Sequence, residues 1–287
     1  ALGKASLMLS CKNIEFEKLK EIFCLLVGNE NKKSLKLVGN KPNAGNYVKI
    51  AHNAIEYAII QSIADFYFIS KEIFGLKNKN IVEEINYIKS QIKNCYLLNI
   101  TEDILKKKNK LSSLIDKVDD NNTGSWASKF ALDCKYSMPI ISSSVDARYL
   151  SKSNRFAIKK EFKKKFKNKI RDFSKLLILN IKASYIQGIG LLDQINKNNQ
   201  IKIYLNNSLL SWQYNSIIRS DYLKEIKKNI KQNKIDIFAV YKKIFDTKTQ
   251  IFYFKVSNFL SLNNFYVPSI FSVCIWLFYH QKNLFFS

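Results

Sequence analysis

The sequence predicts a mostly α-helical protein, in which a large helical bundle follows a short α/β segment. Only three prolines and eight glycines interrupt the 287 residues, which favours long helices over tight β architectures. Hydrophobic residues make up 47% of the chain, ample for a core. From residue 44 onward, apolar positions recur mostly with the helical period rather than the alternation of a strand.

The first segment has the pattern strand, helix, strand. SLML at 6–9 and SLKLVG at 34–39 predict strands, and EFEKLKEIFCLL at 15–26 between them predicts a helix. We interpret residues 1–40 as the end of an α/β domain. The turn signal KPNAG then opens a helical domain over 41–264, and 265–287 forms an apolar tail.

Helices are expected through most of the second domain. The first begins at the KPNAG turn and runs to about Gly75. The later ones are expected at 81–98, 101–118, 125–134, 139–151, 159–171, 175–194, 206–213 and 219–232, with a mixed segment after 235.

The charge balance is strongly basic, with 47 Lys and Arg against 23 Asp and Glu and a net charge of +24. Such a field attracts polyanions. The lysines are spread over many segments, however, and the densest run, at 159–171, places its aromatic residues on one helical stripe. We therefore favour a solvated lysine face over a nucleic-acid site, and expect no nucleic-acid partner.

Cysteine, histidine and apolar runs exclude several further classes. The five cysteines form no C-x-x-C pair, so neither a disulfide framework nor a zinc site is indicated, and a reducing, cytoplasmic location fits. Two histidines are too few for a histidine-based metal cluster. The apolar run 265–279 is shorter than the roughly 20 residues that span a membrane. We expect it to be buried in its own core or against a partner subunit.

No phosphate-binding loop occurs in the chain. There is no G-x-G-x-x-G after a strand and no G-x-x-x-x-G-K-[ST]. QGIG at 187–190 lies inside an apolar helical stretch, so it is interpreted as part of a helix.

Four polar residues interrupt the apolar helix that begins near residue 45. Lys49, His52, Asn53 and Glu56 are spaced i, i+3, i+4 and i+7, which places them on one stripe. The stripe continues as Ile60 and is polar for only about two turns. A short solvated face at a helix start is one interpretation. The other is a lined pocket, in which burial lowers the lysine pKa enough for it to act as a base.

The stretch VGNKPNAGNYVKIAHNAIEYAIIQ resembles the opening of the helical domain of the 6-phosphogluconate dehydrogenase family, G-x-x-V-K-M-x-H-N-x-I-E-Y. Further segments resemble the family in the same order. LIDKVDDNNTGSW is similar to L-D-x-x-x-Q-K-G-T-G-K-W, MPIISSSVDARYLS to P-x-x-x-x-A-V-x-A-R-x-L-S, and SWQYNSIIRSDYL to W-R-x-G-C-I-I-R-S-x-F-L. By this resemblance, residues 1–40 are the remnant of a Rossmann-type NADP-binding domain.

The resemblance implies oxidative decarboxylation of 6-phosphogluconate to ribulose 5-phosphate and CO2, with NADP as cofactor. Lys49 would take the proton of the 3-hydroxyl, and Glu56 would protonate C1 of the enediol. The substrate would be bound by His52, Asn53, Tyr57 and Arg148. The family is also expected to form a homodimer, in which the tail, with His280, reaches the site of the partner subunit.

The sequence departs from the family pattern at three places. Asn121 stands where the family has a phosphate-binding lysine, and Trp276 stands where the family tail has an arginine. The S-G-G substrate motif and the dinucleotide fold would precede Ala1. Three alternatives therefore stay open: a non-catalytic homodimeric remnant of the enzyme, a basic nucleic-acid-binding protein, and a related β-hydroxyacid dehydrogenase.

Overall fold

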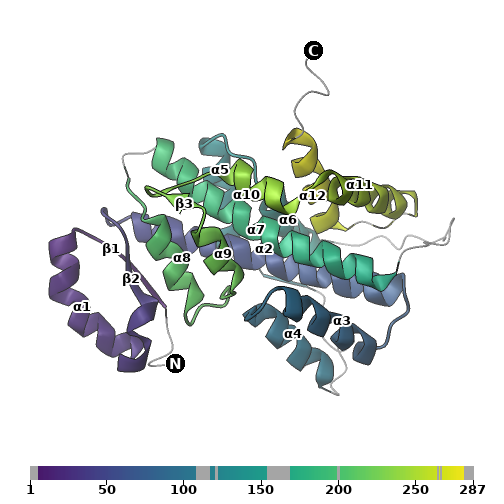
Figure 1. Cartoon of the computed structure of the whole chain (residues 1–287), viewed down its shortest axis with the longest axis horizontal. Coiled ribbons are helices and arrows are strands. Elements are labelled where there is room, and N and C mark those ends of the chain that lie inside the picture. The colour runs from purple at the N-terminus through teal and green to yellow at the C-terminus, as the bar shows by residue number, and fades with distance from the viewer. Residues whose placement is uncertain are drawn as a thin grey trace, which may run out of the picture.

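The computed structural model describes residues 6–107, 117–119, 122–153, 169–198, 201–263, 265 and 267–280, without the side chains of 29–31 and 278–280. Asn121 and most of the basic run 159–171 lie outside these residues. A small α/β end projects from a large helical body (Figure 1), which confirms the predicted fold class.

The α/β end consists of two parallel strands and the helix that connects them. Strand β1 (Leu7–Ser10) pairs with β2 (Leu35–Gly39), and α1 (Asn13–Val27) with the 3-10 helix η1 (Asn29–Ser34) forms the crossover. Parallel strands require such a crossover because their ends lie at opposite edges. The backbone N–H of Gly45 donates to Ser10 Oγ at 2.9 Å, which ties the next helix to the end of β1.

The helical body is built around two long helices, α2 (Ala44–Glu72) and α7 (Ile170–Asn198), which pack against each other. The remaining elements are α3 (Asn78–Gln91), α4 (Tyr96–Lys106), α5 (Thr123–Asp133), α6 (Pro139–Ser151), α8 (Leu205–Gln213), α9 (Tyr222–Lys227), β3 (Ile230–Lys231), β4 (Lys234–Ile235), α10 (Ile237–Ile244), α11 (Thr247–Leu262) and α12 (Pro268–His280).

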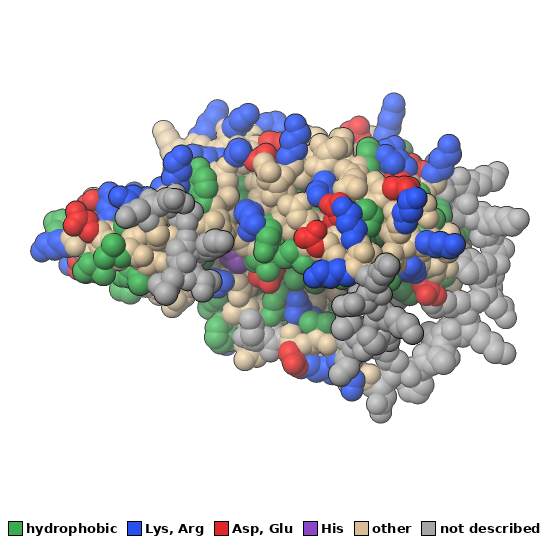
Figure 2. Space-filling view, turned by 90° about the horizontal axis from the view of Figure 1, so that it is seen from below, with side chains coloured by type: hydrophobic (Ala, Val, Ile, Leu, Met, Phe, Trp, Pro, Cys, Tyr) green, Lys and Arg blue, Asp and Glu red, His purple; other side chains and the backbone are tan. Residues whose placement is uncertain are grey.

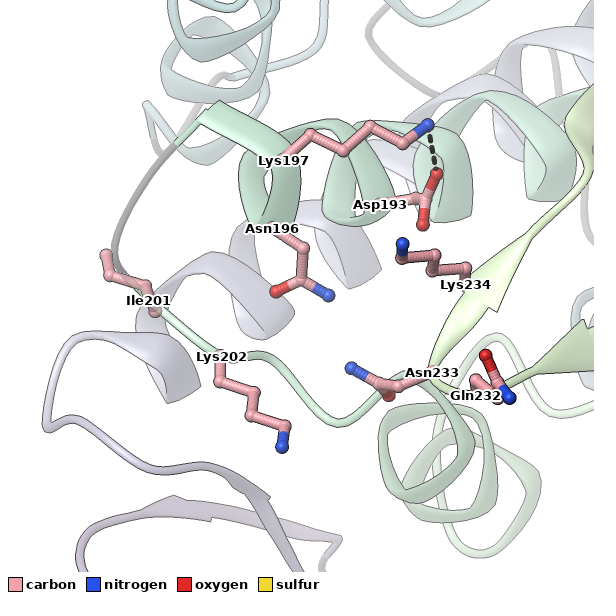
Figure 3. Close-up of a pocket in the computed structure, with 8 residues that line it drawn as sticks. All are labelled: Asp193, Asn196, Lys197, Ile201, Lys202, Gln232, Asn233 and Lys234. Carbon is pink, nitrogen blue, oxygen red and sulfur yellow. Dashed lines mark ion pairs between the residues drawn. The ribbon is translucent and has the colours of Figure 1, made fainter.

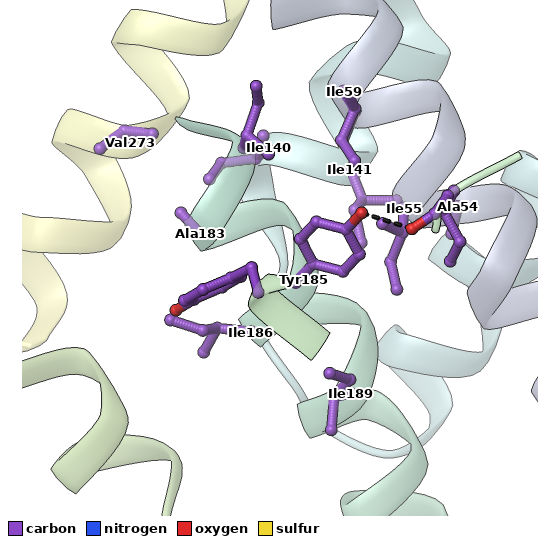
Figure 4. Close-up of a cluster of buried hydrophobic side chains, with 14 of the residues drawn as sticks. Ala54, Ile55, Ile59, Ile140, Ile141, Ala183, Tyr185, Ile186, Ile189 and Val273 are labelled. Atoms are coloured by element: carbon purple, nitrogen blue, oxygen red, sulfur yellow. Dashed lines mark hydrogen bonds between the residues drawn. The ribbon is translucent and has the colours of Figure 1, made fainter. Parts of the chain in front are cut away.

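Close packing of α2 on α7 depends on a glycine. A Cβ at Gly188 would lie 2.3 Å from Ile55 Cγ1, so only glycine allows the two helices to approach this closely. Figure 4 shows the apolar side chains that fill the surrounding core, among them Ile55 and Ile59 of α2 and Ile186 and Ile189 of α7. QGIG is therefore part of a helix, as predicted, and it serves helix packing.

Three predicted helices were wrong in their extent. The helix expected at 101–118 is α4, which begins earlier, at Tyr96, and ends at Lys106. The helix expected at 81–98 is divided into α3 and α4, because Asn94 adopts a positive φ of 57° and the backbone N–H of Tyr96 donates to Arg219 O at 3.2 Å. The helix expected at 219–232 ends at Lys227. A β3–β4 hairpin follows it, with positive φ at both Gln232 and Asn233, the conformation that two-residue hairpin turns require.

The apolar tail packs onto its own chain as far as Leu277. Helix α12 contacts α6, α11 and α2, and the carboxylate of Asp65 accepts a hydrogen bond from the backbone N–H of Ser269 at 2.8 Å. Trp276 is 1% exposed and makes edge contacts with Tyr241 and Phe245. Of the two locations expected for the tail, burial in its own core holds for this part. None of the described helices is long and apolar enough to cross a membrane.

Basic side chains are distributed over the surface rather than gathered in one patch. Figure 2 shows Lys and Arg along the whole visible face, with Asp and Glu between them. Several form exposed pairs at helical spacing, such as Lys20 with Glu17 and Lys175 with Asp172. Exposed pairs of this kind contribute little to stability. On the visible described surface the high charge is therefore diffuse.

Candidate active site on helix α2

The first half of α2 carries the polar stripe predicted from the sequence. His52 and Asn53 are buried, with 4% and 7% of their surface exposed, and Glu56 is half-buried. Lys49 is exposed at the end of the stripe that lies nearer the α/β end. The expected burial of Lys49 is therefore not seen among the described residues, none of which covers its ammonium group.

Buried hydrogen bonds connect the stripe to two distant segments. His52 Nδ1 lies 3.0 Å from Asn53 Oδ1, and His52 Nε2 lies 3.1 Å from Ser216 Oγ. Asn53 Nδ2 donates to Thr123 Oγ1 at 3.1 Å. The two central residues of the stripe thus have their polar atoms held in fixed directions.

His52 is neutral at physiological pH. Burial lowers the pKa of His52 to about 4, and the positive charge of Lys49 contributes to that shift, while the hydrogen bond with Asn53 opposes it. A buried imidazolium beside an ammonium group would be doubly unfavourable. His52 therefore serves in hydrogen bonding, not as a cation, near pH 7.

The pKa of Glu56 is shifted in the opposite direction from that of His52. Burial raises its pKa, and the positive charges of Lys49 and Arg148 partly offset that rise. Both cations are therefore close enough to act on the Glu56 carboxyl group. In the described part of the chain Glu56 makes no hydrogen bond or ion pair, so its carboxyl group is not committed to a structural partner there. A raised pKa suits a carboxyl group that donates a proton.

Arg148 is brought to the stripe by Tyr57. The guanidinium carbon of Arg148 lies 3.5 Å from the centroid of the Tyr57 ring, and Nη1 donates to Asp119 O at 3.0 Å. Stacking on an aromatic ring orients the guanidinium and leaves its other donors available to an anion.

Gly124 makes room for this stack. A Cβ at that position would lie 2.7 Å from two carbons of the Tyr57 ring and 2.8 Å from Val145. The start of α5 can therefore contact α2 only with glycine there.

The structure thus unites six of the predicted site residues around the first half of α2: Lys49, His52, Asn53, Glu56, Tyr57 and Arg148. It does not include Trp276 in this group, because the indole is part of the core beside α10 and α11. The side chain of His280, at the end of α12, lies outside the described residues, as does Asn121.

Two contributing residues were not singled out from the sequence. Thr123 accepts the hydrogen bond of Asn53, and Ser216 contacts His52. Both lie within segments that resemble the family: Thr123 matches the threonine of K-G-T-G-K-W, and Ser216 replaces the cysteine of G-C-I-I-R. That position in the motif was the signal that could have identified them.

A large hollow lies apart from the stripe. This recess, of about 540 Å³, is formed by the end of α7, residues 201–202 and the β3–β4 hairpin. Figure 3 shows Lys197 paired with Asp193 and, facing the same space, Lys202 and Lys234. None of the stripe residues lines it. Within the described ranges there is also no group of His, Cys, Asp and Glu that could bind a metal ion.

The fold and the stripe define a helical domain with a half-buried carboxyl group close to two cationic side chains. The family model of the 6-phosphogluconate dehydrogenase C-terminal domain matches residues 45–270. The chain belongs to the 6-phosphogluconate dehydrogenase family.

Curated relatives agree with this assignment, and a solved structure has a similar fold. Decarboxylating 6-phosphogluconate dehydrogenase of Staphylococcus aureus strain N315 is 34% identical over 204 residues, which is 65% of this chain and 43% of that protein. The decarboxylating 6-phosphogluconate dehydrogenase of Staphylococcus epidermidis is 30% identical over 245 residues, which is 79% of this chain and 52% of that protein. Plasmodium falciparum 6-phosphogluconate dehydrogenase has a similar fold, with a TM-score of 0.79 and 24% identity over 96% of this chain and 63% of that one. The chain spans about half the length of the curated relatives.

Proposed function

We propose that this chain supplies the substrate-binding and proton-transfer groups of a decarboxylating 6-phosphogluconate dehydrogenase. The observation that carries the proposal is the placing of a glutamate with a raised pKa close to the charges of Lys49 and Arg148. The Plasmodium falciparum enzyme has been solved in complex with its cofactor NADP+ and in complex with its substrate 6-phosphogluconate. We extend this pair of ligands to the present protein.

The proposed roles are those that the family resemblance implies, and the position of each group supports them. Arg148, oriented by Tyr57, would bind the phosphate, and Asn53 would donate to an oxygen of the sugar acid. Lys49 would accept the proton of the 3-hydroxyl group while C3 is oxidised to a ketone. Loss of CO2 from the β-keto acid, with return of the proton from Lys49 to the C3 oxygen, leaves an enediol. Glu56 would then donate a proton to the carbon that becomes C1 of ribulose 5-phosphate, while Lys49 takes back the proton of the enediol hydroxyl group.

NADP is the proposed hydride acceptor, but the described residues do not form a site for it. The α/β end has two strands and one crossover helix, with no glycine-rich turn between strand and helix. We therefore assign dinucleotide binding to residues outside the described α/β end.

We also propose a homodimer. In this dimer the tail that includes His280 would reach the site of the partner subunit; the side chain of His280 lies outside the described residues.

The test is Lys49→Met in the full native protein, assayed for 6-phosphogluconate-dependent reduction of NADP+. Removal of a positioned base is expected to lower kcat by roughly 10²–10⁴-fold. Lys79→Met, at an exposed position near the start of α3, is the matched control and should leave kcat unchanged. Full turnover by Lys49→Met would refute the assigned role.

Burial of Trp276 favours a second candidate, a non-catalytic homodimer that keeps the fold. An arginine at this position would have to leave the core to reach a ligand, and the indole is instead 1% exposed. Calorimetric titration of the native protein with 6-phosphogluconate separates the two candidates. Absence of binding would support the non-catalytic candidate, and binding accompanied by turnover would exclude it.

A further inference from the structure

Ser216 lies at the buried end of the hydrogen-bond chain that runs through His52 and Asn53 to Thr123. It is 5% exposed, and it is far from the stripe in sequence. Besides its contact with His52, Ser216 Oγ accepts a hydrogen bond from the backbone N–H of Ile218 at 3.1 Å. The hydroxyl oxygen is therefore fixed from one side by the backbone.

The heavy-atom positions alone allow two directions for the protons of this chain. In one, Ser216 donates to His52 Nε2, and His52 Nδ1–H donates to Asn53 Oδ1. In the other, the Asn53 amide is flipped, its N–H donates to Nδ1, and His52 Nε2–H donates to Ser216. The choice matters because it sets which atom of Asn53 faces Thr123.

The hydroxyl proton of Ser216 decides between them. Among the described residues its one acceptor is His52 Nε2. In the flipped arrangement Ser216 would accept twice and its own buried proton would have no acceptor, which is unfavourable by about 1–3 kcal/mol. The first arrangement pairs every polar hydrogen of the Ser216 side chain and of the neutral imidazole.

We infer that Ser216 is a positioning residue that holds His52 as the Nδ1–H tautomer and thereby orients the Asn53 amide with its N–H toward Thr123. Asn53 then presents a donor, not an acceptor, on the Thr123 side of the site. Together with Lys49 and Arg148, this makes the site rich in donors, which suits the oxygen-rich sugar acid. The purpose assigned to this orientation rests on the proposed function; the tautomer itself does not.

The tautomer of His52 can be measured directly, because the two ring nitrogens give separate NMR signals. The full native protein, labelled with 15N-histidine, is examined near pH 7 by long-range 1H–15N correlation spectra, which distinguish protonated from bare ring nitrogens. A His52→Gln variant, which lacks only the signals of this ring, assigns them. We expect a bare Nε2 and a protonated Nδ1 for His52, and a protonated Nε2 in the wild type would overturn the inference.

In the Ser216→Ala variant, His52 should no longer be held in the Nδ1–H form. Without the hydroxyl donor, the Nε2–H form becomes populated, and kcat falls about 10-fold while the fold, followed by circular dichroism, is kept. Ser216→Cys keeps a weak donor and is expected to restore most of the Nδ1–H form. If Ser216→Ala retains the Nδ1–H form unchanged, the inference is wrong.

The readouts separate the inference from the proposed function. A tautomer that behaves as expected in a protein without turnover would refute the function alone. Turnover that survives with the opposite tautomer would refute the inference alone. If Ser216→Ala does not fold, the wild-type and Ser216→Cys spectra still decide, since both must show the Nδ1–H form.

Discussion

Each half of α2 carries one acidic side chain that is at least partly buried, Glu56 and Asp65, and these two groups have different surroundings. Glu56 is half-buried, makes no hydrogen bond within the described chain, and has two cations near it. Asp65 is buried at 6% exposure and accepts hydrogen bonds from Ser269 N–H at 2.8 Å and Gln61 Nε2 at 2.7 Å. Burial raises the pKa of both.

The difference shows how one helix can serve both chemistry and assembly. The carboxyl group of Asp65 is committed to the backbone at the start of α12, where a carboxylate also interacts favourably with the helix dipole. The carboxyl group of Glu56 is left without a hydrogen-bonded partner in the described chain, which keeps its proton available to a ligand. Substitutions at each position should therefore change different measurements.

The largest effect is expected for Glu56→Gln, which has the same shape but no transferable proton. It should lower kcat by roughly 10²–10⁴-fold with little change in the free energy of unfolding. Steady-state kinetics and urea denaturation on the full native protein test this. Glu83→Gln, at an exposed position on α3, is the control. Unchanged kcat in Glu56→Gln would remove the distinction between the two acidic groups.

A smaller effect is expected for Gly124→Ala. The added methyl group overlaps the Tyr57 ring, so Tyr57 or α5 must move, at a cost of about 1–3 kcal/mol. Displacement of the ring also removes the support of Arg148, and binding of 6-phosphogluconate should weaken. Ser125→Ala is the neighbouring control. Equal stability and affinity in Gly124→Ala and wild type would show that the Tyr57–Arg148 stack is not held by α5.

The smallest effect on activity is expected for Asp65→Asn, which should change only the stability of the fold. The folded-state pKa of Asp65 is raised from 3.8 to about 6, so the folded state binds the proton more tightly than the unfolded state. The contribution to stability is therefore greatest below pH 3.8 and is lost as the pH rises toward about 6.

Asp65→Asn removes the ionisable carboxyl group and with it this loss of stability as the pH rises. The amide oxygen of the new side chain can still accept the hydrogen bond from the backbone N–H of Ser269. The substitution should therefore increase the free energy of unfolding at pH 7 by about 1–3 kcal/mol, with no gain at about pH 4. Urea denaturation at the two pH values measures this. A loss of stability at pH 7 would mean that the charge of Asp65 is needed at the start of α12.

Much of the site was predictable because helical spacing is local. The interval of three or four residues places Lys49, His52, Asn53 and Glu56 on one face of any helix. The motif resemblance added Tyr57 and Arg148. The same local rules predicted the α/β end and most helices, including the range of α6 at 139–151.

Contacts between distant segments were not predictable in the same way. His52 and Ser216 are 164 residues apart, and Asn53 and Thr123 are 70 apart, so packing alone decides that they meet. The division between α3 and α4 likewise depends on residues 219–221, where Asp221 N–H donates to Lys93 O at 2.9 Å. Helix propensity has no information about such partners.

By itself the sequence determined the helical body, the polar stripe and the family, because each depends on the order of residues along one segment. Only the tertiary structure decided that Lys49 is exposed, that Trp276 belongs to the core, and that Ser216 contacts His52. Exposure, burial and the direction of a hydrogen bond are properties of the groups that surround a residue, and those groups come from every part of the chain.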